Sequence, residues 1–401
     1  MENKTFVLNP QNGFWGLACE QGIDGLKEHL ASLEKPKREY NGIQLIALNT
    51  STYCNQRCVY CYIDPSHPYF NTPIAIGRQT VDRALELEHV PKIVFHGSEP
   101  LFNFDLIKDS VEYAERISPN RKISFFVQSN LTLLKDHHLD FFIDHNVSVS
   151  SSLDGFESQH NLNRPLRSGE PSYPIVIENI RKVIDRQKGI HVITVVTKNN
   201  VHALDELVLD YERKGITSVQ FNPPIDFSGN ANYLPGNALL ADSYLKLFQN
   251  SFNRILKGEQ KIKVNNLVQY LSALFVNSGT DSCRLCTSSN EHPIIAVDFD
   301  GEIYPCDFYF GRKNLSLGNI SQNSFSSIMN SEKNPRLQCI KADSCQDCRW
   351  TMLCGGGCLA DTLNSRFKPY YCGTHKTIFE YLSSKAHFLV ESGLAKRILS
   401  S

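Results

Sequence analysis

The chain has 401 residues, with 41 Lys and Arg against 42 Asp and Glu, so its formal net charge is -1 at pH 7. This balance argues against nucleic-acid binding as the main function, and we expect no nucleic-acid partner. No apolar run reaches the roughly 18 residues that a membrane span needs, and the N-terminus lacks the features of a signal peptide. We therefore expect a cytoplasmic protein with one large core and a smaller domain.

Residues 1–42 form an N-terminal extension. Its sequence over 9–35 predicts a short strand or hairpin followed by one helix. An edge strand in the stretch NGFWGLA could pair with a peptide or a partner protein. A hairpin that only covers one end of the main domain is the simpler interpretation, and both stay open.

The middle of the chain alternates between two kinds of segment. Runs of β-branched and apolar residues occur six times, over 43–49, 92–97, 122–129, 147–153, 190–197 and 217–223. Segments with helical periodicity lie between them, among them 80–90, 104–117, 173–187 and 201–215. Strand and helix in alternation predict a parallel sheet with right-handed crossovers. Six repeats suit an α/β fold of the partial (β/α)6 barrel type over 43–236, with ligands at the carboxyl ends of the strands.

Three segments follow the predicted barrel. Residues 237–282 read as a helical bridge, with helix over 237–270. Residues 283–375 carry short strands and Gly-rich turns around many cysteines, which predicts a small domain held by metal rather than by a large core. Residues 376–401 are expected to form a C-terminal helix.

Thirteen cysteines are many for a chain of this kind. Clustered thiols in a long, reducing-compartment protein are more typical of metal ligands than of disulfides. They fall into two regions, because no cysteine lies between Cys61 and Cys283. The sequence therefore predicts two metal-binding regions.

The first region is the stretch CNQRCVYC, with Cys54, Cys58 and Cys61 directly after the first predicted strand. Thiolates bind soft metals and iron–sulfur clusters. A structural zinc site takes four protein ligands and is closed. Three thiols instead leave one coordination position for a group outside the protein, although a zinc loop or buried thiols remain the alternative.

This stretch, with the aromatic Tyr60 before its third cysteine, resembles the cluster-binding loop of the radical S-adenosylmethionine (SAM) family. The resemblance implies a [4Fe–4S] cluster on the three cysteines, with SAM bound to its fourth iron. In that family, electron transfer cleaves SAM to a 5′-deoxyadenosyl radical.

Residues after the later strands extend the resemblance. The stretch HGSEP is similar to the family's GGEP motif, whose backbone holds the SAM amino group, with Ser98 in place of the second glycine. A serine and an arginine beyond the fourth strand match positions for the SAM ribose and carboxylate, and an arginine fork suits a carboxylate. Val219 and Gln220 match positions that pack on the adenine of SAM. The resemblance therefore implies these cofactor-binding residues: Tyr60, Gly97, Ser98, Glu99, Ser152, Arg164 and Val219.

The second cysteine region is similar to the SPASM signature, which carries auxiliary clusters. The resemblance implies two further [4Fe–4S] clusters, one on Cys283, Cys286, Cys306 and Cys358, the other on Cys345, Cys348, Cys354 and Cys372. The spacing of Cys283 departs from the better-known pattern. A pair of zinc knuckles is the alternative, since C-x2-C pairs are common in zinc sites. Cys19 and Cys339 fit neither set.

The segment YPCDFY, followed by LGNI, resembles anaerobic sulfatase-maturating enzymes. In those enzymes the Asp after this cysteine is the base that deprotonates the oxidised residue. Asp307 is therefore the candidate catalytic residue, since a carboxylate near a radical-bearing carbon can take its proton. A residue that only orients the cluster domain is the alternative.

The N-terminal extension and the GSEP sequence resemble instead the maturases of ribosomally made peptides, including the Nif11-type and splicease group. We therefore favour a radical SAM/SPASM enzyme that modifies a precursor peptide, by crosslinking or by tyramine excision that leaves an α-keto-β-amino acid. Its expected partners are the precursor peptide and an electron donor such as flavodoxin or ferredoxin, with a separate small leader-binding protein as a further candidate. A sulfatase-maturating enzyme and a zinc-binding interaction protein are the alternatives.

Overall fold

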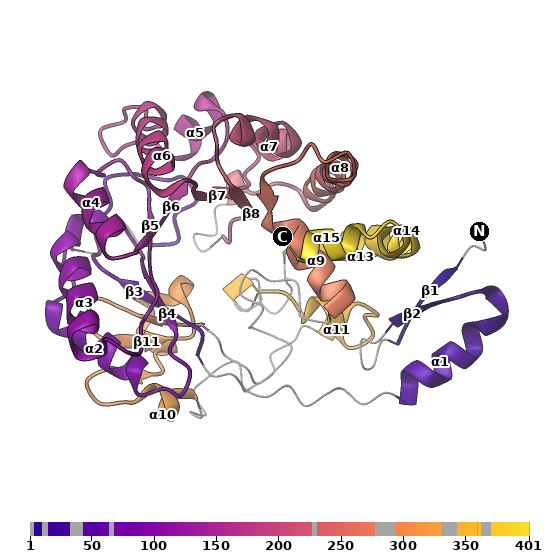
Figure 1. Ribbon diagram of the computed structural model, residues 1–401, viewed down its shortest axis with the longest axis horizontal. Coiled ribbons are helices and arrows are strands. Elements are labelled where there is room, and N and C mark those ends of the chain that lie inside the picture. The colour runs from indigo at the N-terminus through magenta and orange to yellow at the C-terminus, as the bar shows by residue number, and fades with distance from the viewer. Residues whose placement is uncertain are drawn as a thin grey trace.

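The computed structural model describes residues 4–9, 15–32, 43–63, 68–226, 231–276, 294–329, 343–358, 360–361 and 370–400. At the N-terminal end, strands β1 (Thr5–Leu8) and β2 (Trp15–Ala18) pair antiparallel and precede helix α1 (Ile23–Ser32). The extension thus has the hairpin and helix that its sequence predicts. It lies at the periphery in Figure 1.

The main sheet has ten strands in the order β12-β11-β10-β3-β4-β5-β6-β7-β8-β9. Its centre is the six parallel strands β3 (Leu45–Asn49), β4 (Lys92–His96), β5 (Phe125–Ser129), β6 (Ser148–Ser152), β7 (His191–Val195) and β8 (Ser218–Asn222). Figure 1 shows these strands curving with helices along their outer side. The partial (β/α)6 barrel predicted from the sequence is confirmed.

The helices of the barrel follow their strands in chain order. They are α2 (Ile74–Leu85), α3 (Phe104–Ile117), α4 (Asp136–Asp144), α5 (Glu157–Asn163), α6 (Tyr173–Gln187) and α7 (Leu204–Arg213). The helix predicted over 80–90 is wrong in its bounds. It starts directly after Pro73, which is suited to a helix start, and ends before the turn that leads into β4.

The C-terminal domain shares the barrel's sheet. Strand β10 (Ile294–Val297) pairs parallel with β3, and β11 (Glu302–Tyr304) and β12 (Gly318–Asn319) continue antiparallel beyond it. The sequence predicted a small domain held by metal and did not predict this pairing. Strand pairing between distant segments leaves no local sequence signal, because it depends on which edge of the barrel is unpaired.

The helical bridge consists of α8 (Asn237–Leu256) and α9 (Asn265–Val276), with strand β9 (Lys263–Val264) between them. The single helix predicted over 237–270 is therefore divided. The segment 376–401, predicted as a C-terminal helix, is helical and likewise divided. The chain forms α13 (Cys372–Ser384), α14 (Ala386–Glu391) and α15 (Leu394–Leu399), with a break at Gly393 in a left-handed conformation (φ 67°).

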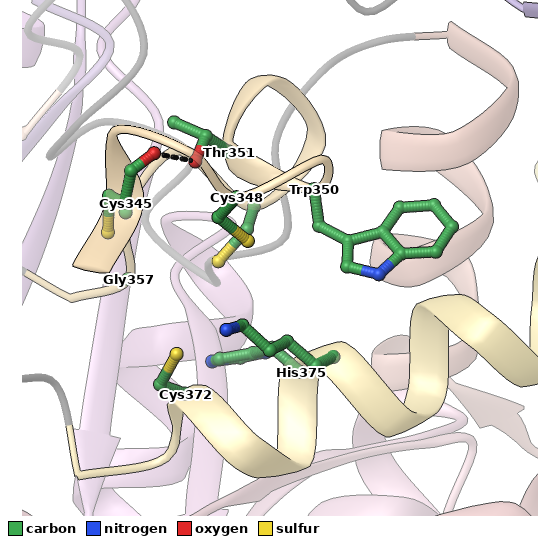
Figure 2. A pocket seen from close by; sticks show the side chains of 10 residues that line it. Cys345, Cys348, Trp350, Thr351, Gly357, Cys372 and His375 are labelled. Atoms are coloured by element: carbon green, nitrogen blue, oxygen red, sulfur yellow. Dashed lines mark hydrogen bonds between the residues drawn. The ribbon is translucent and has the colours of Figure 1, made fainter. Parts of the chain in front are cut away.

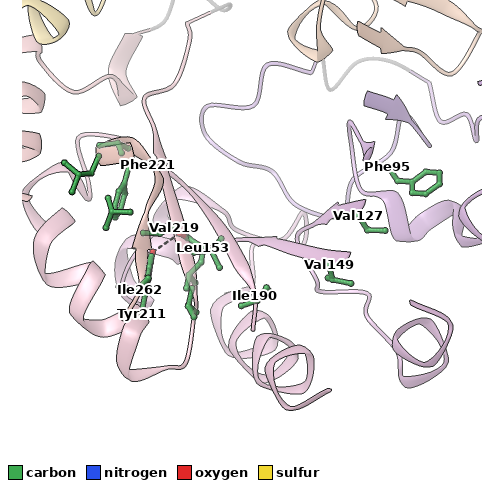
Figure 3. Close-up of a cluster of buried hydrophobic side chains, with 14 of the residues drawn as sticks. Phe95, Val127, Val149, Leu153, Ile190, Tyr211, Val219, Phe221 and Ile262 are labelled. Carbon is green, nitrogen blue, oxygen red and sulfur yellow. Dashed lines mark hydrogen bonds between the residues drawn. The ribbon is translucent and has the colours of Figure 1, made fainter. Parts of the chain in front are cut away.

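The core lies between the sheet and the helices. Alternate residues of the parallel strands point into it, so Phe95, Val127, Val149 and Val219 are all 5% exposed or less. Figure 3 shows Val219 and Phe221 packed in this layer near Ile262. Within the described ranges, no helix is long and apolar enough to cross a membrane.

Candidate active site at the carboxyl ends of the strands

The loop that carries the first three cysteines follows β3 and is fastened to the segment after α5. The Arg57 N–H donates to the Pro165 carbonyl (2.8 Å), and the Val59 N–H donates to the Asn163 carbonyl (3.0 Å). In the opposite direction, the Arg167 N–H donates to the Asn55 carbonyl (2.8 Å). These backbone bonds give a loop without regular secondary structure a fixed shape.

The three thiols lie near one another in this loop. Burial, and next the Glu99 charge, raise the pKa of Cys54 to about 12. Burial also raises the pKa of Cys58 and of Cys61, and for Cys58 the neighbouring Cys61 and Cys54 add to the effect. Such thiols stay protonated at neutral pH until a metal takes the place of the proton. The three thiols of this loop thus lie within range of one another's charge, with Cys61 at its exposed side, and three protein ligands would leave one position of a cluster open.

Two side chains contact the sulfur atoms. The Asn130 Nδ2 lies 3.7 Å from the Cys54 Sγ, and the Arg164 Nη1 lies 3.8 Å from the Cys58 Sγ. Both are nitrogen donors, which stabilise negative charge on sulfur. The sequence assigned no role to Asn130.

Arg164 belongs to a buried ionic group. Its Nε lies 2.9 Å from the Asp154 Oδ2, and Asp154 is fully buried. The Tyr60 hydroxyl also hydrogen-bonds to Asp154, and the Arg164 guanidinium lies over the Tyr60 ring at 5.3 Å. Asp154 therefore orients two of the residues that the sequence placed at the cofactor, Arg164 and Tyr60. The stretch SSLDG contains this aspartate directly after β6, which is the signal that could have found it.

The turn after β4 has a shape that depends on glycine. Gly97 has φ 112°, and a Cβ atom there would lie 2.2 Å from the Asn49 Oδ1. The Glu99 side chain accepts hydrogen bonds from the Ser129 hydroxyl (2.6 Å) and the Asn130 N–H (2.8 Å). Glu99 thus holds the ends of β4 and β5 together, and its carboxylate is occupied by groups of the protein itself.

The remaining predicted cofactor residues lie on β6 and β8. Ser152 is partly buried at the end of β6, and its hydroxyl accepts from the Gln128 amide (3.3 Å). Val219 is 0% exposed and belongs to the hydrophobic core, so its side chain is not open to a ligand. Gln220 exchanges hydrogen bonds with Gln269 of α9.

Asp307 lies where the C-terminal domain meets the cysteine loop. Its Oδ2 accepts from the Tyr62 hydroxyl (2.9 Å) and lies 3.2 Å from the His96 Nε2. Burial alone would raise the pKa of Asp307, but the hydrogen bonds and charge of His96 and the Tyr62 hydroxyl outweigh it and hold the pKa below its usual value. The carboxylate is therefore ionised at neutral pH and able to accept a proton.

Four of the predicted SPASM cysteines line one pocket. Cys345, Cys348, Cys354 and Cys372 surround it, together with Trp350, His375 and Lys376. Figure 2 shows Cys345 and Cys348 on a turn that faces Cys372 at the start of α13. The Thr351 hydroxyl donates to the Cys345 carbonyl (2.6 Å) and closes that turn. We refer to this site as the four-cysteine pocket.

Of the four cysteines predicted to hold the other auxiliary cluster, the structure describes Cys306 and Cys358. Cys306 is 3% exposed, and Cys358 packs against the same small hydrophobic cluster. Cys283, Cys286 and Cys339 lie outside the described residues, and Cys19 follows β2. Within the part of the chain that the structure describes, no three His, Cys, Asp or Glu side chains are grouped for a single metal ion.

Comparison with known proteins agrees with this geometry. Residues 48–210 match the radical SAM superfamily, and residues 286–349 match the SPASM iron–sulfur cluster-binding domain. The cysteine-type anaerobic sulfatase-maturating enzyme of Clostridium novyi is 26% identical over 371 residues, which are 87% of this chain and 98% of that protein. The serine-type enzyme of Bacteroides thetaiotaomicron is 26% identical over 334 residues, 76% of this chain and 80% of that one.

Two solved structures share the fold. Native anSMEcpe with bound AdoMet is 24% identical, with a TM-score of 0.77, and the match covers 88% of this chain and 100% of that one. Streptococcus suis SuiB bound to the precursor peptide SuiA is 14% identical, with a TM-score of 0.62, covering 92% and 97%. Both likenesses concern the fold.

The barrel and its cysteine loop define an enzyme of the radical SAM class, whose cofactors are SAM and iron–sulfur clusters. More particularly, this chain contains a radical SAM domain followed by a C-terminal SPASM domain.

Proposed function

We propose that this enzyme modifies a residue of a peptide or protein substrate by hydrogen-atom abstraction followed by proton loss to Asp307. The observation that carries the proposal is the contact of Asp307 with His96 and Tyr62, because Tyr62 directly follows Cys61 of the cysteine loop. A base is thereby held beside the loop where a substrate radical would form. Asp307 is 22% exposed, which leaves it open to a substrate.

The residues that would hold the cofactors follow from their positions. Cys54, Cys58 and Cys61 would hold the SAM-binding cluster, with SAM at the turn of Gly97 and Ser98 and near Ser152 and Arg164. Cys345, Cys348, Cys354 and Cys372 would hold one auxiliary cluster, and Cys306 and Cys358, with Cys283 and Cys286, the other. When bound, these groups supply the 5′-deoxyadenosyl radical and an acceptor for the electron that the substrate radical loses.

The protein's own residues then have distinct tasks. Asp154 holds Arg164 and Tyr60 in place through a buried ion pair and a hydrogen bond, so the cysteine loop keeps its shape when a substrate binds. His96 and Tyr62 aim the Asp307 carboxylate through its Oδ2. Loss of one hydrogen atom, one proton and one electron balances as a two-electron oxidation of the residue.

Two substrates are compatible with this chemistry. The relatives named as sulfatase-maturating enzymes favour oxidation of a Ser side chain to an aldehyde, or of a Cys side chain to a thioaldehyde that water converts to the aldehyde with release of hydrogen sulfide. The N-terminal hairpin β1–β2 favours a ribosomally made precursor peptide, because an antiparallel pair has two outer edges that can accept a further strand. On such a precursor the product would be a crosslink or a tyramine excision.

The test uses anaerobic holoenzyme with two kinds of probe, a Cys-containing sulfatase-derived peptide and synthetic peptides for any short reading frame found beside the gene. We expect SAM cleavage and a mass change in one of them. An Asp307→Asn variant should still cleave SAM but form at least 100-fold less product, because a general base contributes about 10²–10⁴-fold. Undiminished product formation would remove Asp307 from the chemistry. Protein that binds zinc and no iron would contradict the proposal as a whole.

A further inference from the structure

The four-cysteine pocket contains one imidazole besides its four thiols. His375 lies three residues after Cys372 on α13, so the two side chains share a face of the helix. Figure 2 shows His375 on the side of α13 that faces the turn of Cys345 and Cys348. The active-site chemistry described above leaves this histidine without a role.

A buried tyrosine fixes one nitrogen of this ring. The Tyr270 hydroxyl, from α9, lies 2.7 Å from the His375 Nδ1. Tyr270 is 4% exposed and packs edge-on against Phe248 and Phe379, so it has little freedom to move. Burial lowers the pKa of His375 to about 4, which keeps the imidazole neutral at physiological pH.

A neutral imidazole has one N–H donor and one acceptor nitrogen. When the Tyr270 hydroxyl donates to Nδ1, the ring hydrogen is on Nε2, away from Tyr270. We propose that His375 donates this Nε2–H to a sulfur of the auxiliary cluster in the four-cysteine pocket and raises its reduction potential, with Tyr270 as the positioning residue that holds the ring by its Nδ1. The inference rests on the cluster assignment made under the proposed function.

The physical reason is electrostatic. Reduction adds negative charge to an iron–sulfur cluster, and a hydrogen bond to sulfur stabilises that charge. The potential therefore rises, and the cluster becomes a better acceptor for the electron that a substrate radical must lose.

The experiment is an EPR-monitored redox titration of anaerobic holoprotein. Replacing Cys54, Cys58 and Cys61 by Ala leaves the auxiliary clusters as the only signals. In this background His375→Phe should shift one potential downward by about 59 mV, a tenfold change in the ratio of reduced to oxidised cluster. Tyr270→Phe should shift the same potential in the same direction by less, and His375→Gln, which keeps a side-chain N–H, should restore part of the change.

His191→Phe is the matched control. The His191 Nδ1 likewise pairs with a hydroxyl, that of Ser218 (2.8 Å), and burial lowers its pKa to about 4, but it lies on β7. The His191→Phe variant should therefore leave the reduction potentials of both auxiliary clusters unchanged. Unchanged potentials in His375→Phe with full iron content would overturn the inference, and so would loss of a whole cluster, because His375 would then be a ligand or a fold residue.

Failure of the cluster assignment itself is distinguishable. The double variant Cys345→Ala/Cys348→Ala should lose about four iron atoms per chain, the content of one such cluster. Retention of all the iron would contradict the assignment to this pocket, independently of the result for His375.

Discussion

At the scale of single residues, the site depends on buried side chains that hold the predicted functional residues in position. Asp154 is the clearest case, because it is fully buried and neutralises Arg164 while it accepts from Tyr60. A buried charge of this kind is tolerated only when it is paired and hydrogen-bonded. His160, next to this group, is also fully buried, and its Nδ1 accepts from the Asp154 N–H (3.2 Å).

His160 makes stability depend on pH. Burial, and next the Arg164 charge, lower its pKa to about 3. The unfolded chain therefore binds more protons than the native state between pH 6.5 and 3, so stability falls as pH decreases through that window. Between pH 7 and pH 5, the free energy of unfolding of the wild type should fall by about 2 kcal/mol more than that of His160→Gln.

Chemical unfolding of protein prepared without clusters, at the two pH values, measures this difference. His89→Gln, at an exposed position, controls for the loss of one histidine. Equal pH slopes for the wild type and His160→Gln would refute the assignment.

At the scale of elements, the cysteine loop owes its shape to the segment after α5. Arg167 adds a side-chain contact to the backbone bonds, because its Nε donates to the Cys54 carbonyl (2.6 Å) and its guanidinium lies over the Tyr53 ring at 5.2 Å. The loop and its fastening segment are far apart in sequence and meet only because β3 and β6 end at the same edge of the sheet.

Arg167→Met should loosen this loop and speed loss of its cluster to a chelator about fivefold, the effect of roughly 1 kcal/mol for one hydrogen bond. The decay of the SAM-dependent EPR signal measures the rate. Arg186→Met removes a comparable surface arginine, paired with Asp140 on the outer helices, and should have no effect. Identical decay in the two variants would mean that the backbone bonds alone hold the loop.

At the scale of the whole molecule, the two domains share one sheet and are joined by polar contacts, of which that of Asp298 is buried. Asp298, 2% exposed at the end of β10, accepts from the Asn49 amide (2.8 Å) at the end of β3, and from the Phe299 and Gly311 N–H groups (2.8 Å each). The contact brings the segment of Asp307 next to the cysteine loop. The active site therefore depends on how the two domains join.

Asp298→Ala would leave three donors without an acceptor and should lower the free energy of unfolding by about 3 kcal/mol or more. Urea unfolding of anaerobic holoprotein measures it, and limited proteolysis should show earlier cleavage in the C-terminal domain. Asp300→Ala, which removes a partly exposed carboxylate of the same turn, should cost less than about 1 kcal/mol. Equal costs for the two variants would argue against a role of Asp298 in joining the domains.

The sequence by itself determined the class of protein. Six apolar runs separated by helical periodicity predict a parallel barrel, because those periodicities are set by local geometry. The spacing of Cys54, Cys58 and Cys61 depends on one loop and is equally local. The helices over 104–117 and 173–187 were predicted with the bounds that the structure has.

Only the tertiary structure decided the contacts that join distant segments. The pairing of β10 with β3, the approach of His96 and Tyr62 to Asp307, the burial of Val219 and the Tyr270–His375 pair each bring together residues far apart in the chain. Such contacts depend on the register and order of strands and on which faces pack together. No local pattern encodes them, so the sequence predicted the class of enzyme, and the fold decided which side chains lie together.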